Sequence, residues 1–322
     1  MNFLDTDHGL ARDSYYAATV RRTQSYAPLV GAEECDVAVV GGGFAGLSAS
    51  IELADRGYKV ALLEAKQVAW GASGRNGGQA IAGLACEQVT VEALVGVDDA
   101  RRIWSMTLEA LDIIHERRAR FGIDCDWRAG FLSVAVNAGK ARELRRWQED
   151  MARHYDHETT WIARNDLAQW IASPRYHSGL HDPRSGHLNP LKYGLGLARA
   201  AAGIGVRLHE ASTVTQLVPG PTVLLRTAAG ELRAPHVLLA GHVYMQGLAP
   251  ALERRIMPVG TYIAASEALE PEFANALIPS GCAVCDTNFA LEYFRPTPDH
   301  RLLYGGRVSY STTTPPRLAH GM

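Results

Sequence analysis

The stretch DVAVVGGGFAGLSASIELADRGYKVALLEA at residues 36–65 has the pattern of a strand, a glycine-rich turn, a helix and a second strand. Residues 35–40 form a short β-branched apolar run, which is typical of a strand buried on both faces of a parallel sheet. Apolar residues recur at helical spacing within residues 44–56, and Gly57 suits the left-handed end of that helix. Residues 59–63 then predict a second strand.

The glycines of the turn follow the spacing G-x-G-x-x-G, at Gly41, Gly43 and Gly46. The first permits the tight turn, the second lets the backbone approach a pyrophosphate, and the third lets the helix pack closely on the strand. Phe44 and Ala45 lie between them, at the start of a helix whose amide groups attract phosphate. Glycines in a turn can be purely structural, but a strand before them and a helix after them favour dinucleotide binding.

Glu64 ends the second strand, about 20 residues after the glycines, as in dinucleotide-binding folds. A carboxylate at this place accepts hydrogen bonds from a ribose 2′-hydroxyl and repels a 2′-phosphate. The sequence therefore favours FAD or NAD over NADP, with Glu64 and the adjacent Ala65 as cofactor contacts.

The composition is that of an ordinary globular protein, with 322 residues, 47% of them hydrophobic and 20% charged, enough for one large or two moderate domains. A formal net charge of -2 leaves no basic surplus, so neither nucleic acid nor an anionic membrane is expected as a partner. No apolar run has the length of a signal peptide or of a spanning helix. We expect a cytoplasmic protein that acts on a small molecule.

The five cysteines are odd in number and scattered, unlike a disulfide framework. Cys282 and Cys285 form a CxxC, but no second ligand pair for zinc lies nearby, and the segment is strand-like, whereas redox pairs normally begin a helix. We interpret both as core residues. His187 and His242 adjoin predicted site segments and are interpreted as loop residues, so no metal site is predicted.

A second glycine-rich segment, WGASGRNGG, occupies residues 70–78 and lets backbone amides and an arginine approach a ligand. The sequence also contains GHLNPLKYGLGLARAA (186–201), GVRLHEASTV (205–214), VLLAGHVY (237–244) and LEYFRPTPDHRLLYGGR (291–307). With these segments the chain, from about Ser14 onward, resembles the FAD-dependent amine and amino-acid oxidoreductases of the D-amino-acid oxidase superfamily. Within them it is most similar to the γ-glutamylputrescine oxidoreductase-like branch.

The resemblance implies an α/β fold in which a Rossmann-like FAD-binding domain is interleaved with an α+β substrate domain containing a mixed β-sheet. It implies FAD as the cofactor, with residues 70–78, here named the flavin-side loop, beside the flavin ring. The contacts carried over to this loop are Ser73, Arg75, Asn76, Gly77 and Gly78. Val214 is expected at the adenine and Gly241 near the nucleotide. The alternative, a surface loop with a solvated arginine, is disfavoured by the glycine content directly after a nucleotide-binding unit.

Other enzyme classes lack their signatures in this sequence. A reductase with two dinucleotides would need a second G-x-G-x-x-G, and residues 194–199 break that pattern inside a predicted helix. The Asp-Gly dipeptide usual in aromatic hydroxylases of the related fold is absent, and GASGR does not match the G-x-S-x-G of hydrolases.

The domain boundaries follow from the positions of these segments. We expect an N-terminal extension at residues 1–34, an FAD-binding domain at 35–85 and 186–250, and a substrate domain at 86–185 and 251–322. The substrate domain should contain long helices at residues 98–121 and 139–155, a short helix capped by Asn165, and strands within residues 257–310. In the FAD-binding domain, Asn189 and Pro190 should begin another helix.

The resemblance implies oxidation of a primary or secondary amine or an amino acid, with a γ-glutamylputrescine-like substrate. A hydride passes from the carbon bearing the nitrogen to flavin N5, and the resulting imine hydrolyses. Tyr262, Tyr293 and Arg295 are the candidate catalytic residues, on strands expected to face the flavin. The alternative is that the tyrosines are half-buried sheet residues and that Arg295 is a solvated turn residue.

Two departures from the family pattern qualify this expectation. The only lysines are Lys59, Lys66, Lys140 and Lys192, so the β-rich half lacks the lysine that helps oxygen to react in some of these oxidases. An acceptor other than oxygen is therefore favoured. Thr314 and Pro315 also predict the start of a helix just before the chain stops, whereas family members continue through a segment that returns to the nucleotide domain. A truncated chain is expected, either completed by a C-terminal fragment or a homo-oligomer, or catalytically inactive.

Overall fold

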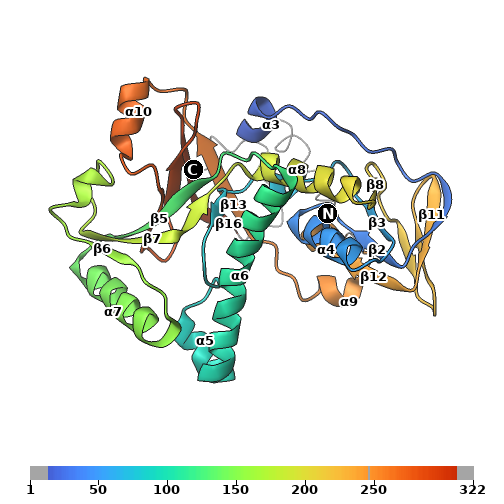
Figure 1. Cartoon of the computed structure of the whole chain (residues 1–322), viewed down its shortest axis with the longest axis horizontal. Helices are drawn as coiled ribbons and strands as arrows, with labels where there is room; N and C mark the ends of the chain where they lie inside the picture. Colours follow the sequence, from blue (N-terminus) through green and yellow to red (C-terminus); the bar gives the residue numbers. More distant parts are fainter. Residues whose placement is uncertain (1–13, 246, 310–322) are drawn as a thin grey trace.

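A computed structural model describes residues 14–245 and 247–309 of the chain. Its strands form three sheets, and Figure 1 shows them on either side of the long helix α6 (Val97–Phe121). Helices combine with one parallel and two mixed sheets, which confirms the predicted α/β class with a mixed sheet. Thr314 and Pro315, where a further helix is predicted to begin, lie outside the described residues.

A parallel four-stranded sheet carries the predicted dinucleotide unit, in the order β12-β2-β3-β8. Its strands are β2 (Val37–Val40), β3 (Val60–Leu63), β8 (Arg207–His209) and β12 (His236–Leu239). On one face, Val39 and Leu62 pack under helices α4 (Phe44–Asp55) and α8 (Pro190–Gly203). The side chain of Asn189 accepts a hydrogen bond from the Lys192 amide, which is the helix cap predicted from the sequence.

A second four-stranded sheet covers the opposite face of the parallel sheet, in the order β1-β11-β10-β9. Its strands are β1 (Gly31–Glu34), β9 (Gln216–Val218), β10 (Val223–Arg226) and β11 (Gly230–Ala234). Leu225 and Leu232 are fully buried there against Ala38 and Ala61 of the parallel sheet. The dinucleotide unit therefore has three layers, with its parallel sheet shielded from water on both faces.

The third and largest sheet is mixed, in the order β13-β16-β15-β14-β5-β7-β4, and β6 pairs with β7. Its strands are β4 (Gln79–Ala80), β5 (Arg128–Ala135), β6 (Thr160–Ile162), β7 (Ser178–His187), β13 (Gly260–Ala265), β14 (Ala283–Asp286), β15 (Tyr293–Pro296) and β16 (Leu302–Ser309). Further helices along the chain are α5 (Gln88–Val95), α7 (Ala138–Tyr155), α9 (Pro250–Glu253) and α10 (Pro271–Leu277), and short 3-10 turns are η1 (Ala72–Gly74), η2 (Leu167–Gln169) and η3 (His242–Tyr244). β14 pairs with β5, although β8 and β12 of the parallel sheet lie between these two strands in the sequence. The two parts of the molecule are therefore interleaved along the chain.

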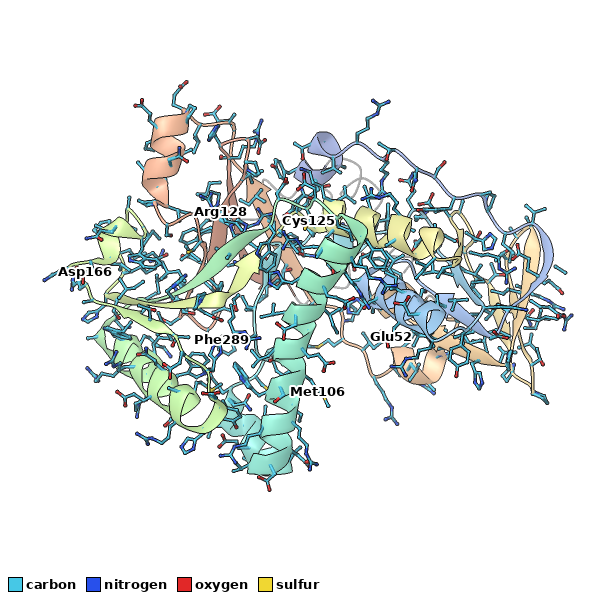
Figure 2. All side chains as sticks on the ribbon, viewed as in Figure 1. Glu52, Met106, Cys125, Arg128, Asp166 and Phe289 are labelled. Carbon is cyan, nitrogen blue, oxygen red and sulfur yellow. The ribbon has the colours of Figure 1, made fainter. Side chains whose placement is uncertain are left out.

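Helix α6 connects the two parts. Figure 2 labels Met106 along the helix and Cys125 just beyond its end, where the chain turns toward β5. Trp104 and Leu111 are buried on one side of the helix, whereas Met106 and Ala110 are exposed. Burial raises the pKa of the Cys125 thiol to about 11, so this thiol is protonated at neutral pH.

The sequence did not predict helix α10. Residues 257–310 were expected to be rich in strands, but β13 ends at Ala265 and Pro271 occupies the first position of α10. Proline at that position is compatible with a helix because its missing N–H would have no partner inside the helix. The short helix expected after Asn165 is reduced to the single turn η2.

The segment before β1 lies across the dinucleotide unit, beginning with helix α3 (Tyr15–Thr19). Arg22 donates to the Val68 carbonyl at 2.8 Å, and the Leu29 amide donates to the Ser212 hydroxyl at 2.9 Å. The Glu210 carboxylate accepts from the Tyr26 amide at 3.0 Å and from the Val68 amide at 2.8 Å. These bonds tie the N-terminal segment to the loops that follow β3 and β8.

Candidate cofactor site

The turn after β2 has the geometry that its glycines predict. Gly41 has a φ of 113°, and a Cβ there would lie 2.6 Å from the Ala240 carbonyl oxygen. A Cβ on Gly46 would lie 1.9 Å from the Gly41 carbonyl oxygen, so α4 packs on the turn only through a glycine. Gly43 is the N-cap of α4 and has no side chain to cap it, which leaves amides of the first helical turn to other partners.

A cavity of about 480 Å³ lies at this turn. Nine of the predicted cofactor contacts line it: Gly41, Gly43, Phe44, Ala45, Glu64, Ala65, Ser73, Val214 and Gly241. Gly46 is buried beneath the turn, where it sets the distance between helix and strand. The structure therefore brings together residues from β2, β3, the flavin-side loop, the loop after β8 and the end of β12.

Glu64 lies directly after β3, and backbone amides hold its carboxylate. Oε2 accepts from the Gly42 amide at 2.6 Å, and Oε1 accepts from the Lys66 amide at 2.9 Å. Burial raises the pKa of this carboxyl, and the hydrogen bonds from these amides offset part of the rise. Each carboxylate oxygen can accept a further hydrogen bond, so a ribose hydroxyl fits on the side of the cavity.

The flavin-side loop is fixed to helix α4 and to itself. The Ser73 hydroxyl accepts from the Phe44 amide at 3.0 Å, at the start of α4. The Asn76 side chain donates to the carbonyls of Ala72 and Ser73, each at 3.1 Å, and accepts from the Gly78 amide at 2.8 Å. Ser73 and Asn76 thus set the shape of the loop, whether or not they also contact the cofactor.

Arg75 lies among aromatic rings rather than in solvent. Its guanidinium donates to the Tyr244 hydroxyl at 2.8 Å and lies 5.4 Å from the centre of the Trp70 ring. The rings of Trp70 and Tyr244 meet edge to face at 5.5 Å. Trp70 and Ala65 line both the 480 Å³ cavity and a neighbouring cavity of about 550 Å³. Arg75 lines the second cavity and brings its positive charge beside Trp70.

The neighbouring cavity has a basic lining. Arg22, Lys66 and Arg75 line it, and no carboxylate is among its lining residues in the described part of the chain. Asn76, Gly77 and Gly78 line neither cavity. Gly77 and Gly78 lie against Tyr293 and Arg295 of strand β15, and the Asn76 carbonyl accepts from Tyr16.

The three candidate catalytic residues do not share one face of the large sheet. Tyr293 and Arg295 are two apart on β15 and point the same way, toward the flavin-side loop. Tyr293 pairs with Gly305, which pairs with Ile263, so Tyr262 points to the opposite face. Tyr262 therefore cannot face the same surface as Tyr293 and Arg295. The catalytic roles of all three residues stay predictions.

Arg295 is also not a solvated turn residue, because only 4% of it is exposed. It donates through Nε to the Gly77 carbonyl at 2.6 Å. Burial raises the pKa of the Tyr293 hydroxyl, and the ring of Tyr293 packs against Gly77. Sequence spacing placed both residues near the cofactor but did not show what they contact.

Several residues of the site carry no signal that a motif search would find. Trp70 and Tyr244 occur within glycine-rich segments noted in the sequence, yet nothing in the spacing shows that they meet. Tyr16 bonds Arg295 and Glu210 bonds the Tyr26 amide, each across more than 180 positions of sequence. Such partners become visible only once the fold is known.

Among the described residues, no cysteine lines either cavity. Cys282 is buried, and burial raises the pKa of Cys285 to about 12. Within residues 14–245 and 247–309, no three histidine, cysteine or acidic side chains are placed to bind one metal ion. None of the helices described is long and apolar enough to cross a membrane.

These residues fit the adenosine and pyrophosphate half of a flavin dinucleotide. The turn excludes any Cβ at Gly41 and Gly46, and the N-cap residue of α4, Gly43, has no side chain to cap the helix. Glu64 follows β3 and lines the cavity, where dinucleotide-binding folds carry the acid that binds a ribose. Fold and cavity together define a dinucleotide-binding α/β protein with a second, mixed sheet.

Comparison with known proteins places the chain within that class. The profile of the FAD dependent oxidoreductase family, DAO, matches residues 36–320, and the chain belongs to this family. FAD is thus its cofactor, and the protein is an FAD-dependent oxidoreductase.

Curated relatives and solved structures agree with this placement. The chain is 39% identical over 303 residues to gamma-glutamylputrescine oxidoreductase of Escherichia coli (strain K12), covering 94% of this chain and 71% of that protein. It is 38% identical over 304 residues to the probable oxidoreductase OrdL of Haemophilus influenzae, covering 92% and 70%.

Two solved structures share the fold. Glycine oxidase from Geobacillus kaustophilus superposes with a TM-score of 0.65 at 23% identity, covering 86% of this chain and 72% of that one. L-amino acid deaminase from Proteus vulgaris gives a TM-score of 0.68 at 20% identity, covering 89% of this chain and 63% of that one. At these identities the likeness concerns the fold alone.

Proposed function

We propose that the protein oxidises a primary or secondary amine or an amino acid, with γ-glutamylputrescine or a close analogue as substrate, to an imine that then hydrolyses. The observation that carries this proposal is the 39% identity, over 94% of this chain, to gamma-glutamylputrescine oxidoreductase. Glycine oxidase and L-amino acid deaminase share the fold, which supports an amine or amino acid as the wider substrate class.

In this proposal FAD supplies the electron acceptor, and the chain supplies binding, orientation and electrostatics. The turn at residues 41–46 and Glu64 hold the phosphates and the ribose. Arg75 provides a positive charge beside the cofactor, which stabilises negative charge that develops on reduction. Trp70 and Tyr244 hold the Arg75 guanidinium in place.

Anaerobic reduction tests the proposal. The purified chain is loaded with FAD and mixed with γ-glutamylputrescine, while the flavin absorbance and the carbonyl product are followed. Loss of the flavin absorbance, with a stoichiometric aldehyde trapped by a hydrazine reagent, is the expected result. Putrescine is the matched control, because it has the same amine without the γ-glutamyl group.

The other outcomes are equally informative. Equal reduction by putrescine, glycine and L-proline would support the amine class and contradict the γ-glutamylputrescine assignment. A chain that binds FAD and is reduced by none of these amines contradicts the proposed reaction and favours a non-catalytic flavoprotein.

We also propose an electron acceptor other than oxygen. No lysine follows Lys192 in the sequence, so the strands of the large sheet that come after it carry none. Reoxidation of the reduced protein in air, compared with reoxidation by an artificial dye, tests this point, and faster reaction with oxygen would contradict it.

A further inference from the structure

A buried pair, Tyr16 and Arg295, joins helix α3 to strand β15 beside the flavin-side loop. The guanidinium donates to the tyrosine hydroxyl at 2.9 Å across 279 positions of sequence, and the residues are 3% and 4% exposed. We propose that this pair positions the flavin-side loop for the flavin ring, which makes the N-terminal segment part of the cofactor site. The inference rests on FAD as the bound cofactor and goes beyond the proposed substrate.

The Arg295 guanidinium makes three hydrogen bonds, and one of them holds the flavin-side loop. Nε donates to the Gly77 carbonyl at 2.6 Å, Nη1 to the Pro296 carbonyl at 3.4 Å, and Nη2 to the Tyr16 hydroxyl. None of these acceptors is a carboxylate. Burying a guanidinium against neutral groups is costly, so its retention indicates a role that an apolar side chain could not fill.

Tyr16 fixes the neighbouring peptide of the same loop. Its hydroxyl donates to the Asn76 carbonyl at 2.7 Å while it accepts from Arg295. Two consecutive carbonyls, those of Asn76 and Gly77, are thus tied to one tyrosine-arginine pair. Because a trans peptide is planar, the amide N–H of Gly77 points opposite to the Asn76 carbonyl, away from the pair. The pair therefore orients a backbone donor toward the other side of the loop.

The flavin-side loop packs closely against strand β15 at Gly77 and Gly78. Gly78 has a φ of 75°, and a Cβ there would lie 2.1 Å from the Leu188 carbonyl oxygen and 2.9 Å from Nη2 of Arg295. A Cβ on Gly77 would lie 2.9 Å from the Tyr293 ring. With such close contacts, the position of the loop backbone depends on where Arg295 and Tyr293 lie on β15.

The N-terminal segment stays attached without the Tyr16 hydroxyl. Hydrogen bonds from Tyr15, Arg22, Tyr26 and Leu29 also hold the segment, and none of them involves the flavin-side loop. The Tyr16 ring also packs against Ala69 and Leu303. Tyr16→Phe therefore removes the bond to the loop and leaves the rest of the docking intact.

Hydrogen exchange of the FAD-free protein and FAD titration test the proposal. In Tyr16→Phe we expect amides of residues 71–79 to exchange about tenfold faster, and the FAD dissociation constant to rise about tenfold, which is the effect of one hydrogen bond. Arg295→Lys should show the same pattern, because an ammonium cannot reach both the Gly77 carbonyl and Tyr16 in the geometry of a guanidinium. The absorption bands of bound FAD should shift in both variants.

Tyr26→Phe is the matched control, since its hydroxyl bonds only the nearby Gln24 side chain among the described residues. It should change neither exchange of residues 71–79 nor FAD affinity. Exchange and affinity in Tyr16→Phe equal to those of Tyr26→Phe would overturn the proposal, as would faster exchange with unchanged FAD affinity and unchanged bands. If the wild-type chain binds FAD but oxidises no amine, only the proposed function is contradicted. The comparison of the variants then still decides whether the Tyr16–Arg295 pair positions the loop.

Discussion

Replacing Gly46 by alanine gives the sharpest test of how the dinucleotide unit is built. The added methyl group would lie 1.9 Å from the Gly41 carbonyl oxygen, whereas Cβ contacts under 3.0 Å are essentially never found. Helix α4 and the turn would have to separate by about 1 Å. Neither is free to move, because Leu47 and Ile51 of the helix are completely buried and Gly41 is hydrogen-bonded to the Leu63 carbonyl.

The expected effects follow from this geometry. Overpacking a closely packed core costs about 1–3 kcal/mol, and with backbone on one side and buried side chains on the other we expect about 3 kcal/mol of unfolding free energy to be lost. A shift of about 1 Å also lengthens an amide-to-phosphate contact of about 2.9 Å beyond hydrogen-bonding distance. Since a hydrogen bond to a charged group contributes about 1.5–3 kcal/mol, the FAD dissociation constant should rise roughly 10- to 100-fold.

Urea unfolding and FAD titration of the full chain measure both effects. Gly203→Ala is the matched control, because Gly203 ends helix α8 with open space around its Cβ position. There the same change should stabilise the protein by up to about 1 kcal/mol and leave FAD affinity unchanged. If Gly46→Ala unfolds at the same urea concentration and binds FAD as tightly as the wild type, the reasoning about this turn is wrong.

Three further predictions concern ionisable groups and the electron acceptor. Burial, followed by the charges of Arg295 and Arg128, lowers the pKa of His187 to about 4 from its ordinary 6.5. As the pH falls, His187 is therefore protonated first in the unfolded chain, and the free energy of unfolding should decrease by up to about 3 kcal/mol between pH 6.5 and 4. The variant His187→Gln should lack this decrease. If the urea midpoints of the variant and the wild type change with pH in parallel, the prediction is wrong. Glu64→Gln should weaken FAD binding and lower the free energy of unfolding by about 1–3 kcal/mol, because an amide has one accepting oxygen for the two backbone donors. An FAD titration equal to that of the wild type would show that the Glu64 carboxylate does not hold the cofactor. Stopped-flow reoxidation should show a dye reacting faster than oxygen, and the reverse order would show that a lysine in the large sheet is not needed.

The dinucleotide unit could be predicted from the sequence because its signals are local. The glycine spacing, the β-branched strand and the position of Glu64 all fall within residues 36–65, and each reports a backbone constraint that one residue type satisfies. The caps at Asn189 and Pro190 are equally local, and the structure has them as predicted.

The large sheet and the catalytic candidates were harder to predict for a physical reason. Which way Tyr262 points depends on its register with β16, where it pairs with Gly306, and nothing in the sequence marks that register. Likewise, Arg295 looked like a turn residue beside a proline, because its partners Tyr16 and Gly77 are more than 200 positions away. Side chains that bond distant backbone leave no periodic pattern.

The order of strands in the parallel sheet also bears on how the protein is made. β2 and β3 come from residues 37–63, but their neighbours on both sides, β8 and β12, come from residues 207–239. At ribosomal speeds of about 5–20 residues per second, the two groups of strands are synthesised on the order of ten seconds apart. During that interval β2 and β3 have unpaired edges and apolar faces, and pairing across so long a loop is slow. The nascent chain is therefore most prone to aggregate before residue 239 has emerged.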